Sequence, residues 1–563
     1  MNYDDKPWLK YYDEWVKPII SFPDITLIDM MERIFKDYPD RPAYHFLGVT
    51  GTFRELDQQS RRFAQYLCEK GCTPGDVVGL CAPNIPQFLI AFLGTLRAGC
   101  VVTGISLLLT PKELAYQIND SEAKVLVTLD ALFEHNFLQI KDDVPELKHI
   151  VVTNIADFLP APKRFLGKLL KKIPSGKIVP VEGKEVISFK DILRDYPAER
   201  PAVDITGDHS ALIYYTGGTT GPPKGAELSH RNMITNVIII GEWCNFEMGA
   251  ETFCSAFPFF HLAGTAVYLY ALYYGATYIL IPDPRNTGHI CKEIGKYHPT
   301  ALVNVPSLYM MLLADPTFAK LDHSHSKLYF SAAAPLAEET IKALEDVVGK
   351  GKMVEGYGMT ETGPLQSLNP LGRTKPGTVG IPLSNVRLKL VDLEGGTKEV
   401  PIGDEGEIIV QTPSLMKGYH NKPEETANAI REFEGEKWMY TGDVARMDEE
   451  GYLTIVDRSK DMIIVSGFKV FSREVEDKLY DHPAVELCAL VGVPNPDRPG
   501  SELVKAFIQL APEYREKDQK KLKEDIISFA RENMAPYKVP KSVEFIDQIP
   551  LTSVGKVDKK ALR

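Results

Sequence analysis

The chain has 563 residues, with 64 basic and 76 acidic side chains and a formal net charge of −12. A chain of this length exceeds a single ordinary core, so we expect two or more domains. Its acidic balance argues against general nucleic-acid binding, which favours a basic surface, so an anionic substrate would need local lysines and arginines.

The cysteines and the apolar runs indicate neither a disulfide framework nor a membrane span. The eight cysteines are widely spaced and form no CxxC pair, which is typical of reduced thiols. No apolar run reaches the roughly 18 residues of a membrane helix. The first residues lack the basic and apolar segments of a signal peptide, so we expect a cytoplasmic protein.

Short apolar runs alternate with helical patterns between about residues 50 and 360. Residues 56–71 have the spacing of an amphipathic helix that stops at a glycine. This alternation predicts parallel sheets covered by helices, with ligands bound beyond the carboxyl ends of the strands. The predicted buried strands are 77–83, 123–129, 149–154, 276–282 and 301–306.

Residues 163–177, KRFLGKLLKKIPSGK, contain six basic residues and no acidic one. Their apolar residues fall near helical spacing, and two interpretations stay open. The first is a helix on a membrane surface, which would bring the protein to the inner face of the membrane. The second is a solvated surface helix with a narrow apolar stripe.

Residues 214–225, YYTGGTTGPPKG, combine glycines, hydroxyls and one lysine after an apolar run. The spacing differs from the common nucleotide loop, because Gly225 and not a serine or threonine follows Lys224. Pro222 and Pro223 also remove two backbone N–H donors. We interpret the segment as a phosphate loop of another type. The alternative is a glycine- and threonine-rich turn between a strand and a helix.

Beyond about residue 380 the pattern becomes β-rich, and near residue 458 it changes again. VRLKLVD, GEIIVQT and GYLTIVD are typical of strands separated by turns, which predicts a smaller β-rich subdomain at about 380–457. Residues 462–563 combine apolar runs with a charged helical stretch at 515–534. This combination predicts a small α+β domain.

Four further motifs follow the glycine-rich loop: EGYGMTETGP (355–364), YTGDVARMDEEGYLTIVDRSKD (440–461), SGFKVFSREVE (466–476) and PLTSVGKVDKK (550–560). Each is weak alone, but the set resembles the AMP-forming adenylating superfamily of acyl-CoA synthetases, luciferases and peptide-synthetase adenylation domains. TGGTTG and GFKVF look most like fatty-acyl-CoA synthetases. Two positions depart from the common pattern: Ser472, where relatives often carry proline, and Gly218, where many carry serine.

The resemblance covers nearly the whole chain and implies an α/β fold. A large N-terminal domain, 1–457, would bind AMP and the acyl group and would contain two parallel-type α/β subdomains and the β-rich subdomain. Residues 458–461 would form a hinge, and 462–563 a mobile α+β C-terminal domain. The implied reaction joins a carboxylic acid to ATP as an acyl-adenylate with release of pyrophosphate. The thiol of coenzyme A then gives acyl-CoA and AMP.

The resemblance also assigns the phosphate contacts. Thr216 and Lys224 would bind the β- and γ-phosphates, and Glu361 with Thr216 would hold Mg²⁺, a hard cation that prefers oxygen ligands. Both substrates are anionic, so the reaction depends on charge neutralisation and in-line positioning. The other loop residues assigned to phosphate are Gly217, Gly218, Thr219, Thr220 and Gly221.

For adenosine, the resemblance implies that Tyr357 stacks on adenine, Asp443 accepts both ribose hydroxyls and Arg458 contacts ribose or phosphate. A strip of small residues would let the flat base approach the backbone: Ala333, Ala334 and Pro335. The nucleotide-binding assignment also includes the neighbours of Tyr357: Glu355, Gly356, Gly358, Met359 and Thr360.

Two lysines imply that the C-terminal domain moves. Lys556 would bridge the carboxylate and the α-phosphate during adenylation, whereas Lys469 would face coenzyme A during thioester formation. Both cannot occupy the active centre together, so the domain would swing about the backbone of Lys460. The residues expected beside Lys469 on the coenzyme A face are Ser466, Gly467 and Phe468.

The acid is less specified than the reaction. His261 is either a packed core histidine or, by resemblance, a residue beside the acyl carboxylate. Gly358 stands where the acetate-activating branch has tryptophan, which implies a substrate larger than acetate. Thr265 stands where some long-chain enzymes have an aromatic gate, and the tyrosines of 264–276 are either core residues or the wall of an acyl slot. A medium- or long-chain fatty acid is the first expectation, and an aromatic or alicyclic carboxylate the second.

Two other functions stay open at this point. A stand-alone adenylating enzyme would pass the acyl group to a carrier protein or stop at the acyl-adenylate. A non-catalytic protein would only bind nucleotide, at a membrane or as a sensor. Amino-acid-activating members of the superfamily place an aspartate in the region of HLAGTAVYLY to hold the α-amine. This sequence has none there, so the resemblance disfavours an amino acid substrate.

Overall fold

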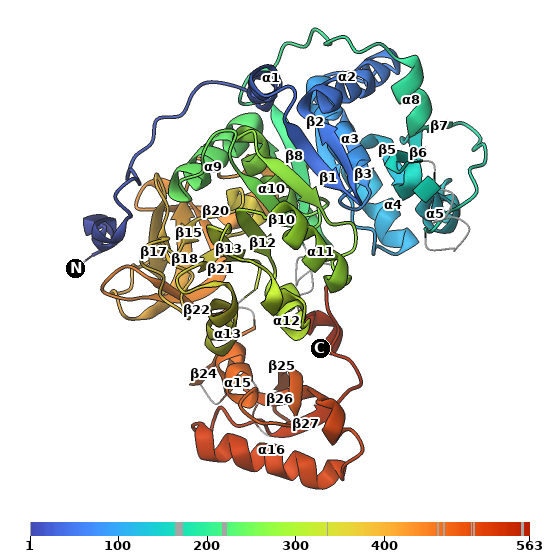
Figure 1. Cartoon of the computed structure of the whole chain (residues 1–563). Helices are drawn as coiled ribbons and strands as arrows, with labels where there is room; N and C mark the ends of the chain where they lie inside the picture. Colours follow the sequence, from blue (N-terminus) through green and yellow to red (C-terminus); the bar gives the residue numbers. More distant parts are fainter. Residues whose placement is uncertain are drawn as a thin grey trace.

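The structure is a computed structural model that describes residues 2–160, 162–163, 173–216, 222–334, 336–458, 461–465, 468–496, 498, 501–552 and 557–563. Within these residues, two large mixed sheets, an antiparallel sheet and a smaller C-terminal α+β unit build the fold (Figure 1). Most of the basic segment 163–177 lies outside the described residues, so its two interpretations stay predictions.

The strands on either side of the predicted phosphate loop belong to a sheet whose central strands are parallel. Antiparallel pairing of Thr216 with Lys224 makes the loop the end of a hairpin, so the alternative of a strand-to-helix turn is wrong. The predicted strands 77–83, 123–129 and 149–154 are confirmed in this sheet. Its order is β19 (Gly418–Tyr419), β9 (Lys224–Ser229), β8 (Ser210–Thr216), β4 (Val101–Gly104), β3 (Val77–Cys81), β5 (Ala123–Leu129), β6 (His149–Thr153) and β7 (Glu185–Ser188).

The second large sheet carries the motif EGYGMTETGP at the end of one of its strands. Its central pairs are parallel and its outer pairs antiparallel, and the predicted strands 276–282 and 301–306 are confirmed within it. Its order is β16 (Ile381–Pro382), β15 (Ser367–Leu368), β14 (Met353–Tyr357), β13 (Leu328–Ser331), β12 (Ala301–Asn304), β10 (Thr252–Ser255), β11 (Thr277–Leu280), β1 (Pro42–Phe46) and β2 (Val49–Thr52).

The predicted helix 56–71 is present, but it spans Phe53–Glu69 (α2). Its earlier start follows from a capping box, in which Thr52 and Glu55 satisfy each other's backbone N–H groups. Gly71 lies beyond its end with a left-handed φ of +79°. Other helices around the two sheets are α1 (Leu27–Asp37), α3 (Pro86–Arg97), α4 (Pro111–Asp120), α8 (Phe189–Asp195), α9 (His230–Trp243), α10 (Leu262–Tyr273), α11 (Thr287–Tyr297), α12 (Pro306–Ala314) and α13 (Glu338–Val348).

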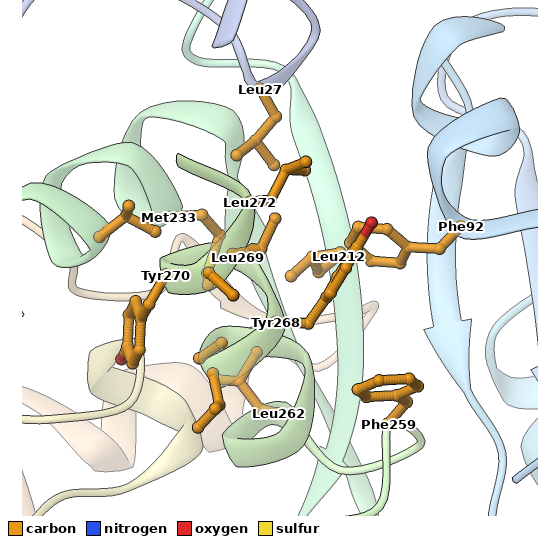
Figure 2. Close-up of a cluster of buried hydrophobic side chains, with 14 of the residues drawn as sticks. Leu27, Phe92, Leu212, Met233, Phe259, Leu262, Tyr268, Leu269, Tyr270 and Leu272 are labelled. Atoms are coloured by element: carbon orange, nitrogen blue, oxygen red, sulfur yellow. The ribbon is translucent and has the colours of Figure 1, made fainter. Parts of the chain in front are cut away.

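The two large sheets share one hydrophobic core. Helix α3 packs on β3 and β4, whereas α10 packs on β10 and β11. Every residue of α3 is buried, as expected for a helix that is apolar on all sides. Phe92 of α3 and Tyr268 of α10 meet edge to face with ring centroids 6.2 Å apart, at the junction of the two layers (Figure 2). The core is therefore continuous from one sheet to the other.

The segment 380–457 is β-rich, as predicted, and two of its short strands belong to the larger sheets. Ile381–Pro382 ends the second sheet, and Gly418–Tyr419 forms the edge of the first. Helix α14 (Pro423–Ala429) follows β19. The remaining strands form an antiparallel sheet: β17 (Arg387–Val391), β18 (Glu405–Gln411), β21 (Glu436–Met447), β20 (Ile430–Phe433) and β22 (Leu453–Arg458).

The C-terminal unit is α+β, as predicted, and appears in red and orange below the sheets in Figure 1. Its residues form their own hydrophobic cluster, which includes Val475, Leu490 and Ile526. Among the residues described, no helix has the length and apolarity needed to cross a bilayer. The elements of the unit are β23 (Ile463–Val465), β24 (Phe468–Val470), α15 (Ser472–Leu479), β25 (Val485–Pro494), β26 (Glu502–Leu510), α16 (Gln519–Asn533) and β27 (Ser542–Phe545).

Candidate active site

The hairpin of β8 and β9 carries two of the predicted phosphate contacts within the described residues. Thr216 ends β8 and Lys224 begins β9, and the Thr216 hydroxyl donates to the Lys224 carbonyl over 3.4 Å. The Tyr116 hydroxyl of α4 donates to the carbonyl of Pro223 over 2.9 Å, which fixes one base of the loop. Gly217, Gly218, Thr219, Thr220 and Gly221 lie outside the described residues.

Lys224 has partners on β19 and on the helix that follows it, α14. Its ammonium forms an ion pair with Glu425 of α14 and lies over the ring of Tyr419, 5.2 Å from the centroid. A cation over an aromatic face is attracted by the ring quadrupole. The loop lysine is therefore held at the hairpin by an anion that an incoming phosphate would have to replace.

Glu361 lies in a short helix, η6 (Thr360–Thr362), that contacts β9. Its side chain is only 5% exposed, and Oε1 accepts a hydrogen bond of 2.8 Å from the Tyr419 hydroxyl. Burial raises the pKa of Glu361 above its ordinary value, although the Tyr419 bond opposes this. A buried carboxylate thus lies beside the strand that begins with the loop lysine.

The residues predicted for adenosine come together from two sheets. The Tyr357 hydroxyl at the end of β14 donates to Asp443 Oδ2 over 2.6 Å. Arg458 Nε, at the end of β22, lies 3.1 Å from Asp443 Oδ1. Asp443 is 6% exposed, so it is a buried carboxylate whose charge Arg458 balances. Ribose hydroxyls could bind Asp443 only if the contacts of Tyr357 and Arg458 with this carboxylate were weakened or exchanged.

The small-residue strip follows β13, next to β14 in parallel register with Ser331 opposite Glu355. Ala333 has a φ of +73°, a left-handed conformation that is strained for a residue with a Cβ. Glu355 Oε1 accepts a bond of 3.1 Å from the Leu336 N–H, and burial raises the pKa of Glu355 to about 7. Ala334 is described beside Ala333, whereas Pro335 lies outside the described residues.

Gly358 has a packing role that the sequence did not indicate. A Cβ at this position would lie 1.7 Å from the carbonyl oxygen of Pro364, so only glycine fits the present backbone. This contact alone accounts for a glycine, which weakens the inference from Gly358 to substrate size. Its neighbours lie on β14, on η6 and between them: Glu355, Gly356, Met359 and Thr360.

His261 is the N-cap of α10, where its Nδ1 accepts from the Ala263 N–H over 3.2 Å. Thr265 is 1% exposed, and its hydroxyl bonds to the Phe259 carbonyl at 2.7 Å and to the Tyr214 hydroxyl at 2.5 Å. Tyr268 and Tyr270 point into the core shared by the two sheets (Figure 2). These two tyrosines therefore belong to the core, and the acyl-slot interpretation of the helix stays a prediction.

The remaining predicted residues belong to the C-terminal side. Phe468 is exposed and stacks on Tyr537 with centroids 4.7 Å apart, and Lys469 follows it on β24, also exposed. The other assignments of this side lie outside the described residues: Lys460, Ser466, Gly467 and Lys556.

Sequence reasoning missed Tyr419 and Glu425, which contact the predicted site residues directly. It also gave no role to Ser472, whose hydroxyl donates to Asp457 Oδ2 over 2.9 Å and accepts from Lys559 Nζ over 2.5 Å. The signal for Ser472 was its departure from the common proline. Tyr419 reaches the site because β19 pairs with β9, and these strands are far apart in the sequence. No local sequence pattern indicates such a pairing.

Comparison with known proteins identifies the family. The sequence model of the AMP-binding enzymes matches residues 31–420, and that of the AMP-binding enzyme C-terminal domain matches 474–556. The chain belongs to the AMP-binding enzyme family. It is an AMP-forming acyl-CoA synthetase, an acid–thiol ligase, as the sequence motifs predicted.

Relatives of this ligase match it over nearly its full length. The long-chain-fatty-acid–CoA ligase of Bacillus subtilis is 37% identical and covers 99% of this chain and 97% of its own. The feruloyl-CoA synthase of an Amycolatopsis species is 32% identical, covering 93% and 96%. The structure of an anthranilate CoA ligase with anthranoyl-AMP has a TM-score of 0.82 at 27% identity, covering 96% and 97%. These matches confirm the predicted fold class.

Proposed function

We propose that this ligase joins a medium- or long-chain fatty acid to coenzyme A through an acyl-adenylate, with Mg²⁺ accompanying ATP. The observation that carries this proposal is the meeting of Lys224 and Glu361 at Tyr419, beside the hairpin that encloses the glycine-rich loop. A cation for phosphate and a buried carboxylate for a metal are what adenylation by two anionic substrates requires. The long-chain-fatty-acid ligases among the relatives support the choice of acid.

The described residues fit a magnesium ion that is shared with substrate. Among them, no group of three or more histidine, cysteine, aspartate or glutamate side chains could form an all-protein metal cage. Mg²⁺ needs only one or two carboxylates when phosphates and water complete its shell. Glu361 offers one carboxylate, of which only Oε1 is taken by Tyr419, and Thr216 offers a hydroxyl. When bound, the metal would neutralise charge on the phosphates.

The remaining residues would bind and orient the substrates. Lys224 would leave Glu425 for the β- and γ-phosphates, and Asp443 with Arg458 would hold the ribose. A carboxylate oxygen of the acid would attack the α-phosphorus and pyrophosphate would leave, with Lys556 bridging the two anions. After the domain swing about Lys460, the thiolate of coenzyme A would attack the acyl carbonyl carbon beside Lys469, and AMP would leave. The boundaries 1–457, 458–461 and 462–563 remain part of this proposal.

An aromatic carboxylate is the second candidate substrate, because a feruloyl-CoA synthase is among the relatives and an anthranilate CoA ligase is similar in structure. The peripheral-membrane interpretation of 163–177 and the cytoplasmic location also stay predictions. Transfer to a carrier protein has no support from the relatives named above.

The experiment is CoA-dependent AMP release across acetate, benzoate, cyclohexanecarboxylate, octanoate and palmitate. We expect the highest kcat/KM with octanoate or palmitate. Higher values with benzoate would select the second candidate. Pyrophosphate exchange without thioester formation would contradict transfer to coenzyme A.

A further inference from the structure

Tyr419 lies between the two groups to which the proposed function gives charged roles. Its hydroxyl donates to Glu361 Oε1 over 2.8 Å, and the Lys224 ammonium lies 5.2 Å from its ring centroid. The three residues come from β19, η6 and the start of β9. One side chain therefore contacts both the proposed metal ligand and the proposed phosphate ligand.

Backbone pairing fixes the position of this ring. Tyr419 stands opposite Ala226 in the pairing of β19 with β9, and Lys224 shares a strand face with Ala226. The pairing is held by bonds of 2.8 Å from the Lys417 N–H to the Glu227 carbonyl and from the His420 N–H to the Gly225 carbonyl. The ring is thus placed diagonally against Lys224 by main-chain geometry.

The same segment also holds the backbone of Glu361. The Met416 N–H donates to the Glu361 carbonyl over 2.8 Å, while the Tyr419 hydroxyl holds one oxygen of the side chain. A neutral hydroxyl orients a carboxylate without cancelling its charge, whereas a lysine or arginine there would form an ion pair. The negative charge of Glu361 stays available to a cation.

We propose that Tyr419 is a positioning residue that couples the magnesium carboxylate to the phosphate lysine. Its hydroxyl fixes the orientation of Glu361, and its ring keeps Lys224 at the hairpin when Glu425 gives way to phosphate. This inference rests on the roles proposed above for Glu361 and Lys224. Hydrogen-bond partners of metal ligands typically change metal affinity or activity by about 10- to 100-fold when they are removed.

The experiment uses Tyr419→Phe, which removes the hydroxyl and keeps the ring. Calorimetry measures the binding of a non-hydrolysable ATP analogue to the full chain at increasing Mg²⁺. Mg²⁺ should increase the affinity for the analogue. In Tyr419→Phe, we expect the Mg²⁺ concentration that gives half of this increase to rise by about 10- to 100-fold, with little change in the affinity measured without Mg²⁺. Tyr419→Leu removes the ring as well, so analogue binding should weaken even without Mg²⁺.

The matched control is Tyr196→Phe, which removes a tyrosine hydroxyl that donates to a carboxylate, Glu69 Oε1, over 3.0 Å and lies outside the proposed site. This control should keep the wild-type Mg²⁺ dependence. Glu361→Gln tests the underlying role, and a wild-type Mg²⁺ dependence in that variant would contradict the proposed metal ligand. If Glu361→Gln loses the dependence while Tyr419→Phe behaves like Tyr196→Phe, the coupling through Tyr419 is wrong and the metal role stands.

A measurement on the wild-type protein covers the case in which Tyr419→Phe fails to fold. Hydrogen exchange of the amides in 416–426 is followed on addition of the analogue with and without Mg²⁺. We expect added protection that requires both, because Glu361 and Lys224 would then fix Tyr419 from two sides. Identical exchange under all conditions would overturn the proposal.

Discussion

The two large sheets and the C-terminal unit are joined to their surroundings by different forces. One apolar core, in which Phe92 meets Tyr268, connects the two sheets. The C-terminal unit has a separate core, and polar contacts link it to the β-rich sheet, among them Ser472 with Asp457 and Arg473 with the Ile455 carbonyl. Separating a buried apolar interface in water costs free energy in proportion to its area. A hydrogen bond can instead be exchanged for one to water at a small net cost. The contrast is what the proposed swing of the C-terminal unit against a rigid N-terminal domain requires.

The largest expected effect is a loss of stability when the core shared by the two sheets is disrupted. Phe92→Ala should destabilise the two-sheet region by about 3–5 kcal/mol, because a fully buried aromatic ring leaves a cavity. Leu490→Ala, in the C-terminal core, is the matched control and should destabilise only that unit. Calorimetry and limited proteolysis would distinguish the regions. Equal effects of both variants on both regions would show that the chain unfolds as one unit.

The next largest effect is a slower rate of adenylation with little change in ATP affinity. Lys556→Ala should slow adenylation by about 10²- to 10³-fold, as for loss of a group that stabilises transition-state charge, with ATP affinity nearly unchanged. Pyrophosphate exchange and analogue binding measure the two quantities. Lys469→Ala is the comparison and should slow thioester formation while adenylation persists. An unchanged adenylation rate in Lys556→Ala would contradict the proposal that Lys556 serves adenylation and Lys469 serves thioester formation.

A smaller effect concerns Glu355 beneath the small-residue strip. Its pKa rises to about 7 because of burial, which outweighs the bond from the Leu336 N–H. Since the unfolded carboxyl ionises near 4.5, the stability present below that pH is lost as the pH rises through 7. Glu355→Gln should remove this loss and be more stable than wild type at pH 8 by about 2–3 kcal/mol.

The measurement for Glu355 is the urea midpoint of both proteins at pH 5 and pH 8. The gain of the glutamine variant should shrink toward zero at pH 5. A gain that is the same at both pH values would show that the carboxyl is not responsible.

The smallest expected effect concerns the polar contacts between the C-terminal unit and the β-rich sheet, here called the polar joint. Ser472→Ala should loosen the C-terminal unit by about 1 kcal/mol, because the bonds to Asp457 and Lys559 are lost. Ser472→Pro should act similarly, since proline is tolerated at the first position of a helix and α15 begins there. Proteolysis near 458–461 should quicken in both variants. If proline protects the joint better than serine, the hydroxyl bonds are not its stabilising feature.

Local patterns predicted the strands of the two large sheets, whereas the motif residues came from the family resemblance and their roles stay predictions. Apolar runs specified the strands, and Tyr357, Asp443 and Arg458 were identified by resemblance before the sheets brought them together. The tyrosines of α10 could not be assigned, because an all-apolar helix has no face that distinguishes core from pocket. The close approach of Pro364 to Gly358 and the place of Tyr419 depend on long-range backbone geometry, which composition and spacing do not encode.

The pairing of β19 with β9 has a consequence during synthesis on the ribosome. Residues 224–229 emerge long before Gly418 and Tyr419, so the outer edge of β9 stays unpaired while the intervening chain is made. An unpaired edge is a template for association with other chains, and contacts between distant segments form late in folding. The nascent protein thus leaves the edge of β9 open to aggregation until the two-residue strand β19 is made and covers it.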